Sequence, residues 1–142
     1  MTLIYQGIDL VHVGKIKAIM LRRPEFAEEV FTGREREYCL SKRDPYIHFA
    51  GRFAAKEACL KALGMGLSGA GIDSALSEIE VTPENSGRPL LNISGWTAKI
   101  GRRKKIGQST VSISHSGDYA IASVILVGGG GAESGPGERS GA

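Results

Sequence analysis

Asp9 and Glu57 are the two acidic residues whose positions point to chemistry. Asp9 lies inside residues 3–11, an apolar and β-branched run that predicts a strand, on the same side as Val11. Burying a carboxylate costs several kcal/mol unless it is paired or binds a cation. A solvated aspartate at the strand end, or one that caps the next helix, would explain Asp9 equally well.

Glu57 precedes Lys61 by one helical turn. Such a pair is common on exposed helices, where it is worth only about 0.3 to 0.5 kcal/mol. Two carboxylates from different elements, together with lysines, would instead suit Mg²⁺ and a diphosphate, because Mg²⁺ takes one or two carboxylates plus substrate oxygens and water. The residues alone leave both interpretations open.

The helix that carries Glu57 is predicted to begin after Asp44, whose side chain caps the first turn ahead of Pro45. It is predicted to end at Gly64. Residues four positions apart along this helix share one strip of its surface. The strip comprises Phe49, Phe53, Glu57 and Lys61.

Apolar periodicity and turn residues predict the remaining elements. Helices are expected at residues 15–22, 24–33, 34–40 and 96–105, and strands at 78–82, 89–94, 110–114 and 119–127. The mixture is typical of the α+β class. One domain is expected over residues 1–127, followed by a Gly-rich flexible tail over residues 128–142 that has almost nothing to bury.

The composition excludes several classes of protein. The chain has 142 residues, 42% of them hydrophobic, which supports one domain with a real core. Its two cysteines form no metal-ligand pattern, which favours free thiols in the cytoplasm over a disulfide scaffold. No apolar run approaches the roughly 20 residues that span a bilayer. The net charge of +3 suggests acidic or phosphate-bearing partners.

Three further patterns carry alternatives. The cations within residues 99–105 would attract nucleic acid, but such a run is usually a solvated surface. Gly64, Gly66 and Gly69 match the dinucleotide-binding spacing, but they follow a helix instead of preceding one. His115 ends a predicted strand, where a packed histidine is commoner than a catalytic one.

Three motifs stand out when their order and spacing are taken together. They are G-I-D-L-V near the N-terminus, F-A-G-R-F-A-A-K-E-A-C-L-K-A-L-G in the middle and S-I-S-H-S near the end. In this combination the chain resembles the holo-[acyl-carrier-protein] synthase family of 4′-phosphopantetheinyl transferases over residues 4–127. The central motif is the most specific of the three.

The resemblance implies a Mg²⁺-dependent enzyme of fatty acid biosynthesis in the cytoplasm. It would transfer 4′-phosphopantetheine from coenzyme A to a serine of apo acyl carrier protein and release adenosine 3′,5′-bisphosphate. The family implies a compact α+β fold with an antiparallel sheet and a long central helix. It also implies a homotrimer with active sites between neighbouring subunits.

The resemblance also assigns roles to individual residues. Asp9 and Glu57 match the metal ligands, Lys61 matches a phosphate-contacting lysine, and His115 matches a histidine near the phosphates. Glu57 is the first choice of base for the serine hydroxyl, and His115 is the second. The expected contacts to coenzyme A are Arg52, Lys56, Lys61, Gly64, Arg88 and His115. A structural ion pair is the alternative for Lys56.

A basic docking surface for the acidic carrier protein is expected on Lys15, Arg22 and Arg23. Two residues depart from the family: His12 stands where many relatives have an acid, and Lys15 where arginine is frequent. Two alternatives to the enzyme remain, a nucleic-acid-binding module built on residues 99–105 and a carrier-binding relative without activity. The module would bind oligonucleotides even after Asp9 and Glu57 are replaced by alanine.

Overall fold

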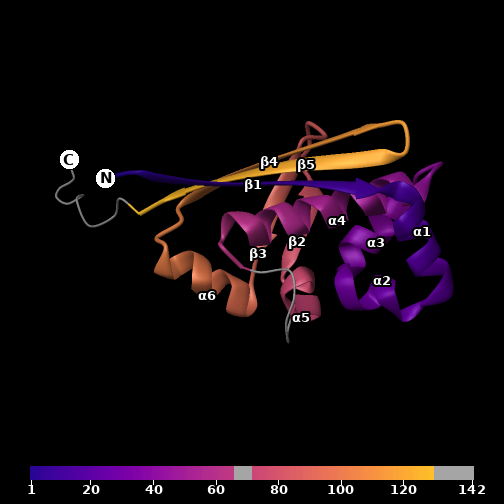
Figure 1. Cartoon of the computed structure of the whole chain (residues 1–142), viewed down its shortest axis with the longest axis horizontal. Coiled ribbons are helices and arrows are strands. Elements are labelled where there is room, and N and C mark those ends of the chain that lie inside the picture. Colours follow the sequence, from indigo (N-terminus) through magenta and orange to yellow (C-terminus); the bar gives the residue numbers. More distant parts are fainter. Residues whose placement is uncertain (66–71, 130–142) are drawn as a thin grey trace.

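The computed structural model describes residues 1–65 and 72–129, in which a long sheet lies along one long helix (Figure 1). The elements in chain order are β1 (Leu3–His12), α1 (Val13–Arg22), α2 (Glu25–Val30), α3 (Gly33–Leu40), α4 (Pro45–Ala62), α5 (Ile72–Ser77), β2 (Ile79–Pro83), β3 (Pro89–Ile93), α6 (Gly95–Arg103), β4 (Gln108–Ser116) and β5 (Tyr119–Gly128). The predicted α+β class, with antiparallel strands and a long central helix, is confirmed.

The helix α4 forms where its end signals predict it. The Asp44 carboxylate accepts a hydrogen bond of 3.2 Å from the backbone N–H of Tyr46, and Pro45 opens the first turn. Gly64, with a φ of +78°, follows the last turn in the left-handed conformation that glycine adopts without strain. Most of the helix is buried, and its exposed edge is narrow.

The longer sheet has the strand order β1-β5-β4, and every pairing in it is antiparallel. One face of β1 packs on α4 with Gly7 and with the side chains of Asp9 and Val11, as the predicted alternation requires. The opposite face of the same strand exposes Ile4 and Ile8. The sheet therefore has one face covered by a helix and one face that the described chain leaves open, on which β1 exposes apolar side chains.

Gly7 lets β1 lie directly against the backbone of α4. A Cβ atom at this position would lie 1.9 Å from the carbonyl oxygen of Ala58 and 2.8 Å from the backbone nitrogen of Ala62. Main-chain atoms inside a helix cannot move aside as a flexible side chain can. Glycine therefore fixes how closely the strand approaches the helix, two residues before Asp9.

Gly7→Ala is expected to destabilise the fold by about 1 to 3 kcal/mol, because the added methyl group pushes the strand off the helix. Urea unfolding measures the change. Gly107→Ala is the matched control, because no atom lies within 4 Å of the position its Cβ would take. Equal unfolding free energies for the two variants would contradict the close approach at Gly7.

The smaller elements cover the two ends of α4. The helices α1, α2 and α3 gather at one end, while α6 lies near the other (Figure 1). The predicted hairpin is confirmed as β2 paired with β3. The prediction missed α5, a six-residue helix directly after the glycine-rich segment. Among the described residues no helix combines the length and apolarity that crossing a membrane requires.

Neither cysteine forms a disulfide, as predicted, and the structure also buries both. Burial raises the pKa of the Cys39 and Cys59 thiols to about 12. The predicted boundary at residue 127 stays a prediction. Gly128 is the last residue of β5, and residues 130–142 lie outside the part of the chain that the structure describes.

Candidate active site

Asp9, Glu57 and Lys61 meet between β1 and α4, and we call them the carboxylate cluster. The Lys61 ammonium donates hydrogen bonds of 2.8 Å to Asp9 Oδ1 and 3.1 Å to the carbonyl oxygen of Ile8. The Asp9 side chain is only 10% exposed. Its second oxygen, Oδ2, is buried and has no hydrogen-bond partner among the described residues. The strand and the helix thus bring together three residues that the resemblance assigns to one site.

This cluster contains two carboxyl groups but only one ammonium group. Burial raises the pKa of Glu57 to about 8, the neighbouring Asp9 carboxylate adds to the shift, and the charge of Lys61 opposes it. The Glu57 carboxyl group therefore keeps a proton far above its ordinary range. Full ionisation of the cluster calls for another cation.

The raised pKa predicts how stability depends on pH without added metal. The unfolded chain loses the Glu57 proton near pH 4.5, whereas the folded chain keeps it to about pH 8. The folded state binds more protons in this window, so the Glu57 contribution to stability falls as pH rises through it and levels off above. Glu57→Gln removes this fall. The free energy of unfolding of the variant minus that of the unchanged chain, measured in urea, is therefore expected to grow from pH 5 to pH 8. A constant difference would contradict the shift.

A second group of predicted residues lines a pocket of about 210 Å³ on another side of α4, and we call it the basic pocket. The residues around it are Tyr38, His48, Arg52, Pro83, Gly87, Pro89, Ile113 and His115. The Arg52 guanidinium lies 4.0 Å from the centre of the Tyr38 ring. Its Nε is buried and makes no hydrogen bond in the described chain, which leaves a donor for an anionic ligand.

His48 belongs to the basic pocket although the sequence analysis did not identify it. Burial lowers the pKa of His48, and the positive charges of Arg52 and Lys42 lower it further. His48 lies one helical turn before Arg52, and this spacing was the available signal. Its partner His115 comes from β4, 67 positions later, and only the fold brings the two together.

The carboxylate cluster and the basic pocket do not meet within one chain. Arg52 and Glu57 are five residues apart on α4, which separates their directions by about 140° around the helix axis. Asp9 lies on β1 and His115 on β4, at opposite edges of a sheet whose middle strand is β5. One chain therefore presents two halves of the predicted site on different sides.

Lys56 is a correction to the predicted coenzyme contacts. Its side chain is fully buried, and its ammonium donates to Glu35 Oε1 at 2.7 Å, to the carbonyl oxygen of Leu76 at 2.9 Å and to that of Ile79. An ammonium has three donors, so none remains for a ligand. Lys56 instead joins α4 to α3 and β2, which is the structural ion pair that the sequence left open.

The remaining predicted coenzyme residues lie at the surface. Gly64 is exposed at the end of α4, whereas Gly66 and Gly69 lie outside the described residues. Arg88 is exposed on the turn between β2 and β3, 3.9 Å from Glu84, and its neighbours Gly87 and Pro89 line the basic pocket. Arg88 is thus placed beside the pocket.

The predicted docking residues lie on and after α1. Lys15 and Arg22 are exposed. Arg23 forms hydrogen bonds of 3.3 Å to Glu25 and 3.1 Å to Glu29, so two carboxylates already offset its charge. Of the three predicted docking residues, Lys15 and Arg22 therefore keep a positive charge that no carboxylate of the described chain offsets.

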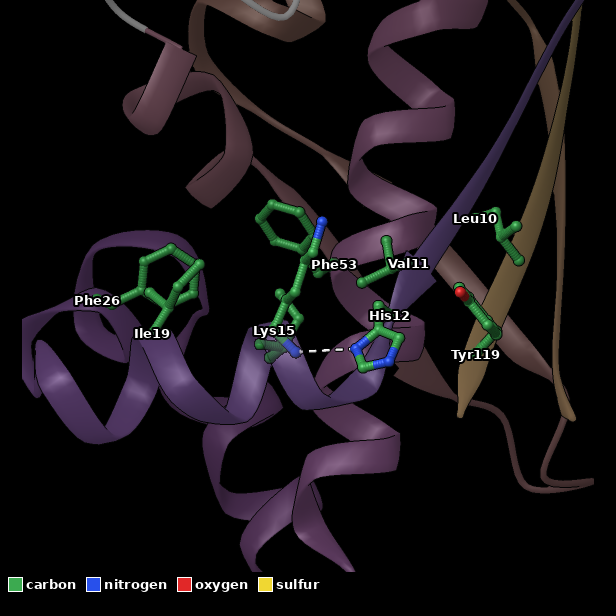
Figure 2. A pocket seen from close by; sticks show the side chains of 9 residues that line it. Leu10, Val11, His12, Lys15, Ile19, Phe26, Phe53 and Tyr119 are labelled. Carbon is green, nitrogen blue, oxygen red and sulfur yellow. Dashed lines mark hydrogen bonds between the residues drawn. The ribbon is translucent and has the colours of Figure 1, made fainter. Parts of the chain in front are cut away.

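An apolar pocket of about 360 Å³ lies beside α1. Leu10, Val11, His12, Lys15, Ile16, Ile19, Phe26, Phe53 and Tyr119 line it. Figure 2 shows the Phe26 and Ile19 side chains at one end and Leu10 with Tyr119 at the other. Phe53 belongs to the same strip of α4 as Glu57, so this pocket adjoins the carboxylate cluster along the helix.

Comparison with known proteins places these features in a family. The sequence model of the 4′-phosphopantetheinyl transferase superfamily matches residues 6–124. A holo-[acyl-carrier-protein] synthase of Syntrophus aciditrophicus is 45% identical over 123 residues, which cover 86% of this chain and 94% of that protein. The enzyme of the same name from Caldanaerobacter subterraneus is 39% identical over 126 residues, covering 89% and 96%.

A solved structure agrees with this similarity. The coenzyme A complex of the synthase from Chronobacterium ammoniagenes has a TM-score of 0.75 and 33% sequence identity, and the match covers 87% of this chain and 96% of that one. The matched proteins are named for carrier-protein modification. The nucleic-acid-binding module considered for residues 99–105 finds no support in them.

Proposed function

The chain belongs to the 4′-phosphopantetheinyl transferase superfamily, and we propose that it is a holo-[acyl-carrier-protein] synthase. In this reaction a serine hydroxyl of apo acyl carrier protein attacks the β-phosphate of coenzyme A. The carrier gains 4′-phosphopantetheine, and adenosine 3′,5′-bisphosphate leaves. The observation that carries the proposal is the carboxylate cluster, in which two acids and a lysine from distant parts of the sequence meet.

Intact mass spectrometry of the carrier tests the proposal. The protein is incubated with apo acyl carrier protein, coenzyme A and Mg²⁺, and a parallel sample contains a chelator. The carrier is expected to gain the mass of one phosphopantetheine group only in the sample with free metal. No gain on carriers that a known synthase modifies would refute the proposed reaction.

We propose that Asp9 and Glu57 hold Mg²⁺. Two observations support the fit: Asp9 Oδ2 is buried without a donor, and the Asp9 charge raises the pKa of Glu57. The described residues contain no group of three or more acids, histidines or cysteines that could hold a metal. Two carboxylates are sufficient for Mg²⁺, because substrate oxygens and water fill its other positions. When bound, the ion would neutralise charge on the diphosphate.

Lys61 and Glu57 supply the remaining chemistry of the cluster. Two of the three Lys61 donors bond to Asp9 and Ile8, so a third is available for a phosphate oxygen. Glu57 is the proposed base for the serine hydroxyl: it accepts the proton in its ionised form, which a cation bound beside it would favour. His115 is the second candidate, and its place in the basic pocket favours phosphate binding instead.

The basic pocket is proposed to bind the phosphorylated nucleotide end of coenzyme A. Arg52 offers a buried donor without a partner, and His48 and His115 add further donors. Because the pocket and the carboxylate cluster lie apart within one chain, we propose that they meet between two subunits of a homotrimer. A cyclic trimer brings the same two surfaces together three times.

The open face of the longer sheet supports the trimer. Ile4 is 69% exposed, and Ile8 and Leu10 are exposed beside it on β1. Tyr119 and Ile121 extend the exposed apolar side chains onto β5. Exposed apolar side chains gathered on one face in this way are typical of a subunit interface. Sedimentation at working concentration tests the assembly, and Ile8→Asp is expected to shift it to monomers.

Mixing two inactive variants tests the shared site. Glu57→Gln damages one half of the site and His115→Ala the other, so each variant alone is expected to lose most activity. When equal amounts are refolded together, about a quarter of the sites should combine an intact Glu57 half from one chain with an intact His115 half from its neighbour. About a quarter of the sites are therefore expected to regain activity. Activity that stays at the level of the separate variants would place the whole site within one chain.

Lys15 and Arg22 are proposed to attract the acidic carrier protein, and the apolar pocket beside α1 to receive one of its apolar side chains. Arg23 contributes less, because Glu25 and Glu29 offset its charge. We place the reaction in the cytoplasm, since both thiols are free.

A further inference from the structure

His12 lies at the corner between β1 and α1 and has no part in the reaction proposed above (Figure 2). The strand ends at His12 and the helix begins at Val13, so no loop separates them. His12 Nδ1 accepts a hydrogen bond of 3.3 Å from the backbone N–H of Lys15. The imidazole therefore caps α1, at a position where asparagine, aspartate or serine is usual.

The ring of His12 is held from the sheet side. Tyr119 stands opposite His12 in the pairing of β1 with β5, and the two rings meet edge to face with centroids 5.2 Å apart. The N–H of Val13 donates a hydrogen bond of 2.8 Å to the carbonyl oxygen of Asp118 in the turn before β5. The first turn of α1 is thus tied to the β4–β5 hairpin through both side chain and backbone.

Gly14 provides the space that the ring occupies. A Cβ atom at Gly14 would lie 2.8 Å from His12 Cε1 and 3.1 Å from His12 Nδ1. Glycine is unfavourable inside a helix compared with alanine, and Gly14 lies in the first turn of α1. The pair His12 and Gly14 therefore acts as one unit, in which a small residue admits a large capping ring.

The same ring forms part of the wall of the apolar pocket, beside the first turn that carries Lys15. We propose that His12 is a positioning residue for carrier docking. By capping α1, the imidazole fixes the first helical turn, and with it the Lys15 charge and the pocket wall that Tyr119 completes. This inference rests on the proposed function, in which the carrier docks at α1.

His12→Ala and His12→Asn test the inference, because alanine removes the cap and asparagine restores one. The affinity for fluorescently labelled apo carrier protein is measured without coenzyme A, and KM and kcat are measured separately. His12→Ala is expected to weaken carrier affinity and raise the carrier KM roughly three- to tenfold, with KM for coenzyme A unchanged. His12→Asn is expected to recover most of the loss.

Gly14→Ala gives an independent variant that does not depend on how His12→Ala folds. Helix propensity alone predicts that alanine makes α1 more stable, whereas crowding of the His12 ring by the added methyl group predicts weaker carrier binding. The effect is expected to disappear in the His12→Asn background, because the shorter side chain leaves room for the methyl group. Such non-additivity is the signature of direct contact.

Two results would overturn the positioning role: carrier affinity that is unchanged in both His12→Ala and Gly14→Ala, or KM values that rise equally for both substrates. The wild-type chain could also bind the carrier with an affinity that depends on His12 and yet make no product. That result would refute the proposed reaction and leave the positioning role intact. A wild-type chain that does not bind the carrier would refute docking at α1 and the role of His12 with it.

Discussion

Glu57→Gln is expected to slow phosphopantetheine transfer by about 10² to 10⁴-fold, because the variant loses both the proposed base and one charge of the metal site. Glutamine has the shape of glutamate, so the packing between β1 and α4 should survive. Asp9→Asn is expected to give a loss of similar size and also to break the ion pair with Lys61. The rate of carrier modification at saturating Mg²⁺ is the measurement.

Glu37→Gln is the matched control, because Glu37 is exposed on α3, away from the carboxylate cluster. Its rate should equal that of the unchanged chain. Circular dichroism and urea unfolding verify that Glu57→Gln is folded. A folded Glu57→Gln protein with more than about a tenth of the original rate would contradict the role of Glu57 as the base.

Lys56→Met is expected to destabilise the fold by about 3 to 5 kcal/mol, because it leaves the buried Glu35 carboxylate without its cation. Burial lowers the pKa of Lys56, and the attraction of Glu35 opposes that shift. The loss is large beside the roughly 5 to 15 kcal/mol that holds an ordinary domain together. Urea unfolding at pH 7 measures it.

Lys99→Met is the control, since Lys99 is exposed on α6 and should tolerate the change. The double variant Lys56→Met with Glu35→Gln removes both buried charges, while the glutamine oxygen still accepts from Val81 or Thr32. It is expected to be more stable than Lys56→Met alone. Equal losses for Lys56→Met and Lys99→Met would show that the ion pair contributes nothing.

The local signals in the sequence predicted the elements that bring the carboxylate cluster together. Strand alternation set the side of β1 on which Asp9 lies, and the spacing of four on α4 put Glu57 next to Lys61. Caps and glycines marked the ends of α4. These signals act over a few residues, which is why a single sequence reveals them.

Two of the contacts that were missed depend on residues far apart in the chain. Lys56 pairs with Glu35, which lies 21 positions earlier in the chain. Nothing in the spacing distinguishes such a lysine from one that contacts a ligand. The basic pocket unites His48 of α4 with His115 of β4, which requires the sheet to be in place first. The cap at His12 was missed because histidine is an unusual residue there.

The burial of both thiols makes the chain convenient for chemical labelling. Reagents such as maleimides react with the thiolate, and thiols with a pKa of about 12 that are shielded from solvent supply almost none at neutral pH. A single cysteine introduced on the surface, for example at Ser86 on the exposed β2–β3 turn, would therefore take a dye alone. The two native cysteines therefore need not be replaced before a dye is attached for fluorescence studies of assembly and docking.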